Sequence, residues 1–196
     1  VPRRVGALPA FSVGRGNRPD TDRGMSDWTL RLARPEDADY MPRIEKAASA
    51  LFANDPAFAT VDMTETRSPE EMRRLIRKGH SLITYVEEEP AGFLVSEPFR
   101  RELHIWEMDV DPGYQKRGIG AGLVRACLID ARNTGFRAVT LTTFRDLPWN
   151  GPFYARLGCE EVTALDAHPR LAGELAVEAD NGFPAERRCA MIQFLD

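Results

Sequence analysis

Apolar and polar side chains follow recognisable periods along the first third of the chain. Residues 28–32 alternate between the two kinds, which predicts a first strand. Residues 33–52 instead repeat apolar side chains three or four positions apart, which predicts a helix directly after that strand. The repeating positions of this helix are Met41, Ile44, Ala48 and Leu51.

A second helix is predicted over residues 68–79 by signals at both of its ends. Ser68 is placed to cap the N-terminus, Pro69 suits the first helical position, and Glu71 completes a capping box. Gly79 then provides a stop signal. Both boundaries of this helix are therefore fixed by the sequence.

The middle of the chain is rich in residues that favour strands. Residues 82–86 and 92–95 are two short runs separated by acidic residues and Pro90, which is typical of a hairpin. Residues 103–110 predict a third strand of this group. Residues 138–144 form a continuous β-branched run, which is typical of a buried strand.

Helical segments are predicted between and after these strands. Residues 120–133 carry apolar side chains in helical order, and the helix is expected to end at Gly135. Asn150 is placed to cap a short helix that runs to Leu157 and Gly158. Late strands are expected at residues 159–163 and 189–194, and residues 167–180 are expected to be helical or loop.

The order of these elements mixes hairpins with one crossover connection. Such an order predicts a single α/β domain built around a mixed sheet. Residues 1–24 are rich in Gly, Pro and Arg and show no period, so we interpret them as a disordered leader or an upstream extension. The folded domain is therefore expected over residues 25–196, and the leader is expected to be dispensable.

Composition excludes several function classes. The 196 residues are 43% hydrophobic and 29% charged, which suits one globular domain. The net charge of −4 argues against nucleic-acid binding, which needs a surplus of basic side chains, and suits an amine substrate. Three cysteines without a CxxC pair, histidines without metal-ligand spacing and the lack of a long apolar stretch predict a cytoplasmic protein with no metal and no membrane span.

The segment QKRGIGAG, residues 115–122, places two cations and three glycines between a strand and a helix. Free backbone N–H groups at the start of a helix bind phosphate, helped by the helix dipole. The spacing lacks the GK[ST] of a P-loop and the GxGxxG of a dinucleotide fold. The remaining ligand class is coenzyme A, with Lys116 and Arg117 near its phosphates, and a plain strand-to-helix turn is the alternative.

Two stretches around this segment resemble the GNAT superfamily of acetyl-CoA-dependent N-acetyltransferases. The stretch MDVDPGYQKRGIGAGLV, residues 108–124, is similar to its acetyl-CoA motif, Q/R-x-x-G-x-G/A, with Gln115, Gly118 and Gly120 at the fixed positions. The stretch NGPFYARLGC, residues 150–159, resembles its second motif, with a final cysteine where the family usually has phenylalanine. The two motifs together make this resemblance specific, although they say nothing about the acceptor.

The resemblance implies a mostly antiparallel mixed sheet that is splayed between its fourth and fifth strands and flanked by helices. Acetyl-CoA would bind along this opening, with its pantetheine arm beside the end of strand 103–110 and its pyrophosphate on the glycine segment. The residues expected to bind it are Met108, Val110, Gln115, Lys116, Arg117, Gly118, Ile119, Gly120, Ala121 and Asn150. For Asn150, a plain N-cap role is an equal alternative.

The resemblance also implies candidates for acid-base catalysis. Tyr154 matches the position of the acid that protonates the coenzyme A thiolate, and a packed core tyrosine is the alternative. Side chains alternate along strand 103–110, which places His104 on the same face as Val110 and Glu107 on the other. His104 stands where other branches of the superfamily carry a base, so it is the first candidate, Glu107 the second, and ordered water the third.

These features predict an acyltransferase that moves an acetyl group from acetyl-CoA to a primary amine, by direct attack in a ternary complex. Residues 51–67 and the loop after Phe144 are expected to face the amine, which belongs to a small molecule or a peptide. A non-catalytic acetyl-CoA sensor, a succinyl-CoA enzyme and a nicotinamide-dependent oxidoreductase are the alternatives. No nucleic-acid or membrane partner is expected, and a homodimer is left open.

Overall fold

Residues 27–52, 55, 58, 61 and 65–195 are described by the computed structural model. The predicted leader, residues 1–24, lies outside this part of the chain, so its role stays a prediction. The strands are β1 (Trp28–Leu32), β2 (Leu82–Val86), β3 (Glu89–Phe99), β4 (Glu102–Val110), β5 (Ala138–Phe144), β6 (Glu160–Glu161) and β7 (Arg188–Phe194). The α-helices are α1 (Met41–Ser49), α2 (Pro69–Ile76), α3 (Ile119–Asn133), α4 (Gly151–Arg156) and α5 (Pro169–Asp180).

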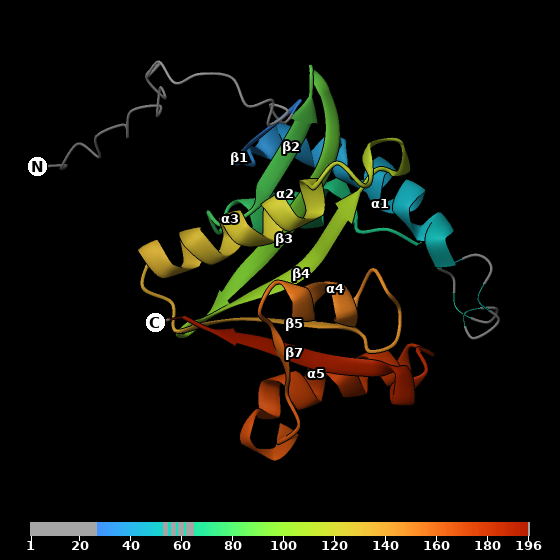
Figure 1. The fold of residues 1–196 in the computed structure, drawn as a ribbon, viewed down its shortest axis with the longest axis vertical. Helices are drawn as coiled ribbons and strands as arrows, with labels where there is room; N and C mark the ends of the chain where they lie inside the picture. Colours follow the sequence, from blue (N-terminus) through green and yellow to red (C-terminus); the bar gives the residue numbers. More distant parts are fainter. Residues whose placement is uncertain (1–26, 53–54, 56–57, 59–60, 62–64, 196) are drawn as a thin grey trace, which may run out of the picture.

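All seven strands form one sheet in the order β1-β2-β3-β4-β5-β7-β6. Each strand is antiparallel to its neighbours, except that β4 and β5 are parallel. Helices lie on both sides of the sheet, and the described residues form a single α/β domain (Figure 1). The predicted fold class is thereby confirmed, including the order of strands and helices along the chain.

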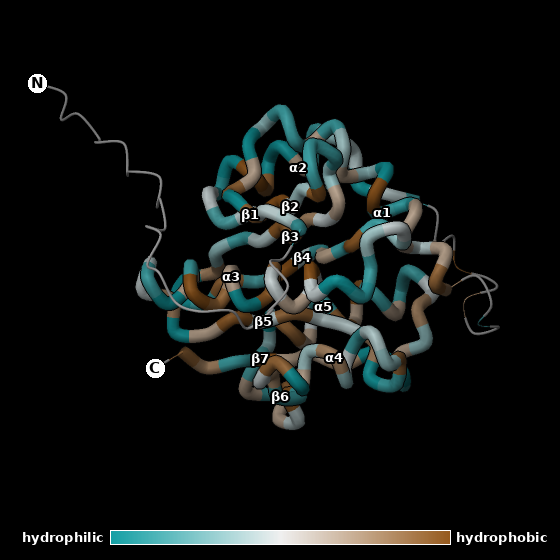
Figure 2. Tube along the Cα trace, turned by 45° about the horizontal axis from the view of Figure 1, so that its top comes forward, coloured by the Kyte–Doolittle hydropathy of each residue, from teal (hydrophilic) through white to brown (hydrophobic). Residues whose placement is uncertain are grey.

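Two apolar layers hold the helices against opposite faces of the sheet. On one face, α1 and α2 pack on β3 through Phe93 and Val95, whose side chains are fully buried. On the other face, α3 packs on the sheet through Leu123 and Cys127, and Leu94 of β3 joins this layer. Figure 2 shows the hydrophobic segments concentrated on the interior strands and the hydrophilic ones on the outer loops. No helix in the described part of the chain is long and apolar enough to cross a membrane.

Helix α2 begins as its sequence predicts. The Ser68 hydroxyl accepts a hydrogen bond from the Glu71 backbone N–H at 3.3 Å, and the Glu71 carboxylate accepts one from the Ser68 N–H at 2.8 Å. Pro69 occupies the first helical position, and Gly79 follows the helix with a positive φ of 93°. The capping box and the stop signal are both confirmed.

A bulge in β4 overturns the alternation predicted for that strand. Glu107 pairs with Val95, whereas Ile105 pairs with the next residue of β3, Ser96. Trp106 is therefore an extra residue with no partner of its own. An extra residue in one strand reverses which side chains face which side of the sheet beyond it.

The consequence is that the faces of β4 switch halfway along the strand. Leu103 and Ile105 belong to the layer under α3, and beyond the bulge Met108 and Val110 belong to the same layer. The prediction that His104 shares a face with Val110 is therefore wrong. His104 lies on the opposite face, the one covered by α1 and α2. Its ring packs against Trp106, which belongs to the layer under these helices. Phe93 and Val95, the β3 partners of Asp109 and Glu107, belong to the same layer.

The sheet opens between β4 and β5. Their parallel pairing runs from Glu102 and Ala138 to Ile105 and Leu141, and then it stops. Beyond this point β4 stays paired with β3, and β5 stays paired with β7. Figure 1 shows the ends of β4 and β5 diverging. The predicted splay between the fourth and fifth strands is thereby confirmed.

Two details differ from the sequence-based expectations, and one open alternative is decided. The first helix ends at Ser49, and Leu51 lies in a short 3-10 turn with 39% of its surface exposed. Residues 169–180, left open as helix or loop, are helical. Asn150 stands at the N-cap of α4, but its side chain makes no capping hydrogen bond.

The third glycine of the segment 115–122 has a packing role. Gly122 lies in the first turns of α3, and a Cβ atom placed on it would collide with the indole ring of Trp28 in β1. The same indole donates a hydrogen bond from Nε1 to the Arg117 carbonyl at 3.1 Å. The first strand is thus fixed against the start of α3 at a point where only glycine fits.

We predict that Gly122→Ala lowers the free energy of unfolding by about 1–3 kcal/mol, because the added methyl group overpacks a filled contact. The control is Gly173→Ala in α5, where a Cβ atom would meet nothing within 4 Å. That change should stabilise the protein by up to about 1 kcal/mol through helix propensity. Urea denaturation measures both, and equal effects of the two substitutions would contradict the packing role.

Candidate active site

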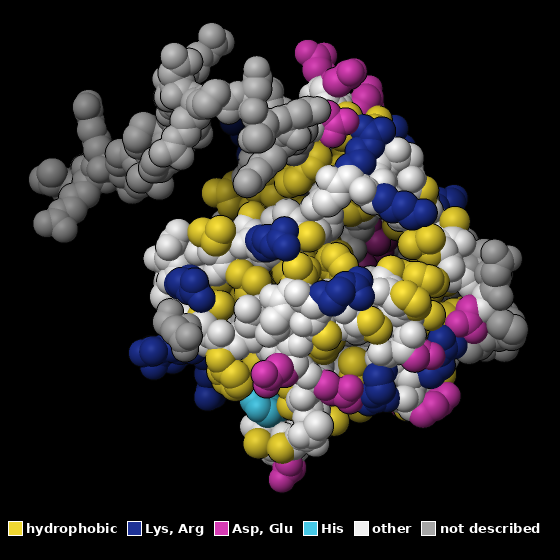
Figure 3. All heavy atoms as spheres, viewed as in Figure 1, with side chains coloured by type: hydrophobic (Ala, Val, Ile, Leu, Met, Phe, Trp, Pro, Cys, Tyr) yellow, Lys and Arg dark blue, Asp and Glu magenta, His cyan; other side chains and the backbone are white. Residues whose placement is uncertain are grey.

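The opening between β4 and β5 leads into a cavity of about 1310 Å³. This volume exceeds the roughly 300–1000 Å³ of an ordinary small-ligand pocket. Residues from α1, β4, α3, β5, α4 and α5 line it, together with the loop between β4 and α3. Figure 3 shows a hollow to the right of the centre, with acidic side chains deep inside it. The cavity is large enough to hold two ligands end to end.

One end of the cavity is formed by the start of α3. Gly118 is the N-cap of this helix and has a positive φ of 81°, which glycine adopts without strain. It offers no side chain to bond the first backbone N–H groups, and the first helical bond runs from the Gly122 N–H to the Gly118 carbonyl. Gly118, Ile119, Gly120 and Ala121 line the cavity. The backbone N–H groups of the first helical turn have no partner within the helix, so they are available to an anionic ligand.

The residues just before this turn hold it in place. The Gln115 side chain donates a hydrogen bond from Nε2 to the Val110 carbonyl at 3.1 Å, which ties the loop to the end of β4. A Cβ atom on Gly120 would lie 3.5 Å from the Phe153 ring and 3.8 Å from Val110. The Gln115 side chain thus holds the turn against β4 through its hydrogen bond to Val110. Both Gln115 and Met108 line the cavity.

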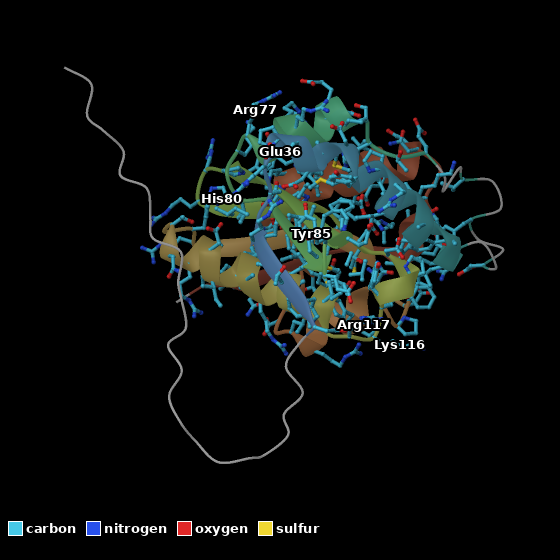
Figure 4. The ribbon with its side chains drawn as sticks, turned by 90° about the horizontal axis from the view of Figure 1, so that it is seen from above. Glu36, Arg77, His80, Tyr85, Lys116 and Arg117 are labelled. Atoms are coloured by element: carbon cyan, nitrogen blue, oxygen red, sulfur yellow. The ribbon has the colours of Figure 1, made fainter. Side chains whose placement is uncertain are left out.

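The two predicted cations occupy different positions. Figure 4, seen from above, shows Lys116 and Arg117 side by side at one edge of the molecule. Lys116 lines the cavity. Arg117 is not among the residues that line it, because its guanidinium pairs with Asp27 at 2.8 Å and lies over the Tyr114 ring. Of the two, Lys116 is the one within reach of a ligand in the cavity.

Asn150 presents an unused acceptor to the same cavity. Its Nδ2 donates a hydrogen bond to the Thr143 hydroxyl at 2.9 Å, which orients the amide. Its Oδ1 is buried and has no hydrogen-bond partner among the described residues. A buried acceptor without a partner is costly, so this oxygen is placed to receive an N–H from a ligand. The pantetheine arm of coenzyme A carries such amide N–H groups.

Tyr154 follows on the same short helix, and its side chain is 6% exposed. It lines the cavity together with Phe153. The two rings pack edge-on, with 5.1 Å between their centroids. Burial, followed by the nearby charges of Glu107 and Asp109, raises the pKa of the Tyr154 phenol far above its ordinary value. The phenol therefore keeps its proton at every physiological pH.

Three carboxylates gather in the middle of the cavity. Glu107 and Asp109 come from β4 beyond the bulge, and Glu45 comes from α1. Burial raises the pKa of Glu107, and burial together with Glu107 and Glu45 raises the pKa of Asp109 well above its ordinary value. Burial, then the Glu107 charge, raises the pKa of Glu45 to about 8. The Asp109 Oδ2 atom is buried without a partner in the described structure.

Arg67 is a cation beside these carboxylates. Its backbone N–H donates to the Glu45 carboxylate at 3.2 Å, and its guanidinium lies over the Trp106 ring at 5.6 Å. Its charge lowers the pKa values of Glu45 and Glu107, against the larger effect of burial. An ammonium ion bound beside these carboxylates would favour their ionised forms, so the group suits a cationic ligand.

His104 lies outside the cavity. Its side chain is fully buried, its Nδ1 is 3.0 Å from the Thr140 hydroxyl, and its ring packs edge-on against Trp106. Burial, then the charges of Arg170 and Arg67, lowers the pKa of His104 to about 3. The imidazole is therefore neutral near pH 7 and is not among the residues that line the cavity.

Sequence reasoning missed Glu45 and did not single out Arg67, which is the last residue of the segment 51–67 that was expected to face the amine. Glu45 sits in α1 between positions of the apolar face, and Arg67 sits just before the capping box of α2. Neither position carries a motif, because it is the packing of α1 and α2 against β4 that brings them to Glu107. A charged residue next to the apolar face of a helix was the one available signal, and that signal is weak.

Comparison with known proteins places this geometry in a family. Residues 48–159, more than half of the chain, match the model of the acetyltransferase (GNAT) family. The region that matches includes β4, the glycine turn and α4.

Solved structures with the same fold include several acetyltransferases. Ard1 from Thermoplasma volcanium is 19% identical with a TM-score of 0.62, and the match covers 87% of this chain and 99% of that one. The PaiA N-acetyltransferase from Thermoplasma acidophilum, solved with coenzyme A, is 13% identical with a TM-score of 0.66, covering 86% and 99%. The ribosomal-protein-S18-alanine N-acetyltransferase from Escherichia coli is 17% identical with a TM-score of 0.57, covering 84% and 90%.

These likenesses extend over the whole described domain and agree with the family match on the fold. At such identities the solved structures speak for the fold alone, whereas the family match carries the class of enzyme. The chain therefore belongs to the acetyltransferase (GNAT) family and is an acyltransferase.

Proposed function

We propose that this protein transfers the acetyl group of acetyl-CoA to a primary amine by direct attack within a ternary complex. The observation that carries the proposal is one continuous cavity with two chemically different halves. One half offers free backbone N–H groups at the start of α3, and the other half offers buried carboxylates on β4 and α1. The first half suits a pyrophosphate and the second suits an ammonium ion.

The chain's own residues fit acetyl-CoA as the cosubstrate. The backbone from Gly118 to Ala121 would hold the pyrophosphate, with Lys116 beside it. The unpartnered Asn150 Oδ1 would accept an amide N–H of the pantetheine arm. The end of β4 near Val110, which pairs with β3 but not with β5, would offer backbone groups on its open edge to the same arm. Acetyl-CoA supplies the thioester that the amine attacks.

Glu107 is the base in this proposal. It lies in the cavity at the point where β4 leaves β5, and it belongs to the carboxylate group that attracts an ammonium ion. A raised carboxyl pKa brings the base closer to the working pH and makes it a better proton acceptor. His104 is less suitable because it lies outside the cavity lining and its pKa is lowered to about 3.

Tyr154 is the acid that protonates the departing thiolate. Its hydroxyl belongs to a residue that lines the same cavity as the carboxylates, and its raised pKa keeps the proton in place until it is needed. The charge of Glu107 is one cause of that raised pKa. Once Glu107 has taken a proton from the amine, this cause disappears, so Tyr154 becomes a stronger acid at the moment the thiolate forms.

The proton and bond changes balance with these two residues. The ammonium gives one proton to Glu107, and the free amine then forms a C–N bond to the acetyl carbon. The C–S bond breaks, and the thiolate takes the phenolic proton of Tyr154. The nitrogen loses its second proton to restore Tyr154, and Glu107 releases the first proton to solvent. The products are an amide, free coenzyme A and one proton.

The phosphate-binding half is tested by Gly120→Glu. We expect this variant to fold but to show no thermal shift with acetyl-CoA, because a carboxylate would stand where the pyrophosphate binds. Gly173→Glu places the same side chain in open space on α5 and should keep the full shift. An undiminished shift in Gly120→Glu would move the pyrophosphate away from this turn.

Tyr154→Phe tests the acid. Turnover should fall by on the order of 10² to 10⁴, the usual span for a general acid, while the affinity for acetyl-CoA stays unchanged. Tyr40→Phe removes the hydroxyl of an exposed tyrosine at the start of α1 and should turn over like the parent. If Tyr154→Phe also turns over like the parent, the phenol only packs and water protonates the thiolate.

The pH profile of kcat tests the base. A base must be ionised to act, so turnover should be present above the raised pKa of Glu107 and lost as the pH falls through it. Glu107→Gln should remove this acidic limb and lower kcat by about 10²- to 10⁴-fold. His104→Gln should keep the limb, because a group with a pKa of about 3 does not titrate in this range. The opposite pattern would assign the base to His104.

A further inference from the structure

The half of the cavity that faces the acceptor combines a charged floor with an apolar rim. The floor is the group of carboxylates Glu45, Glu107 and Asp109. We define the rim by its members on three segments: the 3-10 turn after α1, the loop after β5, and the end of α5 with the loop that follows it. The rim residues are Leu51, Phe52, Trp149, Val177 and Phe183.

The rim leaves large hydrophobic side chains in solvent. Trp149 is 41% exposed and Val177 is 56% exposed, and Leu51 is exposed to a similar degree. These side chains come from separate segments but border the same cavity, and in Figure 3 hydrophobic atoms border part of the hollow whose bottom is acidic. Apolar side chains gathered around a concave site mark a surface that a ligand covers.

Aromatic contacts hold the rim rigid. The Phe52 ring packs edge-on against the Trp149 ring, with 6.3 Å between the ring centroids. The Phe183 ring packs against the Phe144 ring, with 5.9 Å between the centroids. Phe52 also reaches Phe144 at 5.6 Å, so the rings from the three segments form one connected group. The Arg188 guanidinium covers the Phe144 ring at 4.4 Å from its centre. A preformed apolar wall of this kind suits a flat or compact apolar group.

Charges near the rim are mostly engaged by partners within the chain. Glu178 pairs with Arg188 at 2.7 Å and accepts a hydrogen bond from the Thr142 hydroxyl. Glu71 is held in the capping box of α2 by Ser68. Neither carboxylate is free to bind a second ammonium group at the outer end of an acceptor.

Two other carboxylates, Glu65 and Glu174, also line the cavity. A diamine is therefore the competing acceptor. Arg67, with its unpartnered Nε, would be the site for an acceptor that carries a carboxylate. Both competitors differ from an apolar amine by one charge, which makes them directly testable.

We infer that the acceptor is a primary amine with a single positive charge, joined through a short chain to an apolar group such as an aromatic ring. The ammonium binds to the carboxylate floor, and the apolar group lies against the rim. This inference rests on the proposed function and adds the class of acceptor to it.

Matched pairs of acceptors test the class at saturating acetyl-CoA. Phenethylamine and phenylalanine differ by one carboxylate, and hexylamine and 1,6-diaminohexane differ by a second ammonium group. We expect phenethylamine to exceed phenylalanine, and hexylamine to exceed 1,6-diaminohexane, in kcat/KM by at least about 10-fold. The carboxylate of phenylalanine would lie beside the carboxylate floor, and the second ammonium group of the diamine would lie against the apolar rim. A higher kcat/KM for the diamine or for phenylalanine would overturn the inference.

A pair of variants ties the preference to the rim. Val177→Asp places a carboxylate on the rim, while Ile129→Asp places one on α3 at a site that is 59% exposed and away from the cavity. Val177→Asp should lower kcat/KM for phenethylamine by about 10-fold and raise the relative rate with 1,6-diaminohexane. Ile129→Asp should behave like the parent with all four amines. Equal profiles of the two variants would show that the rim does not contact the acceptor.

The outcomes separate the two proposals. Turnover of some amines with the wrong order of preference would overturn the acceptor class and leave acetyl transfer to an amine standing. Thermal stabilisation by acetyl-CoA without acetylation of any of the four amines would overturn the acceptor class. If acetyl-CoA binds but a polyamine, an aminoglycoside and a peptide N-terminus are not acetylated either, the proposed acetyl transfer is overturned as well.

Discussion

The end of the pairing between β4 and β5 is the constraint on which the rest of the site depends. Four residue pairs hold these parallel strands together, from Glu102 to Ile105, and beyond them the strands separate. Each strand keeps its other neighbour, so the sheet opens without losing its order. Beyond Ile105, the edge of β4 that faces the gap has no strand as its partner, in the interior of a domain where such groups are normally paired. Its backbone is therefore open to a ligand, apart from the Val110 carbonyl, which accepts a hydrogen bond from Gln115.

The bulge at Trp106 decides which side chains enter this opening. It turns Met108 and Val110 toward the layer under α3, and it turns Glu107 and Asp109 toward α1. Because α1 brings Glu45 to the same place, carboxylates collect where water is scarce and their pKa values rise. One extra residue in a strand thus separates the side on which we propose that the cosubstrate binds from the side on which we propose that the amine binds.

The sequence predicted those parts of the fold that local signals determine. The capping box of α2 at Ser68 and the buried strand β5 follow from residues adjacent in the chain, and so does the glycine turn before α3. The bulge left no such signal, because strict alternation along β4 was the simplest reading of its residues. His104 was consequently placed on the wrong face, and Glu45 was not foreseen because only tertiary packing brings it to the site.

The central claim is that both substrates occupy one cavity at the same time and that the amine attacks directly. Initial rates measured over a grid of acetyl-CoA and phenethylamine concentrations test this claim without any substitution in the protein. Direct attack in a ternary complex predicts double-reciprocal lines that intersect, and no release of coenzyme A when the amine is omitted. Parallel lines, together with a burst of coenzyme A in the absence of amine, would indicate a covalent acetyl-enzyme and contradict the account.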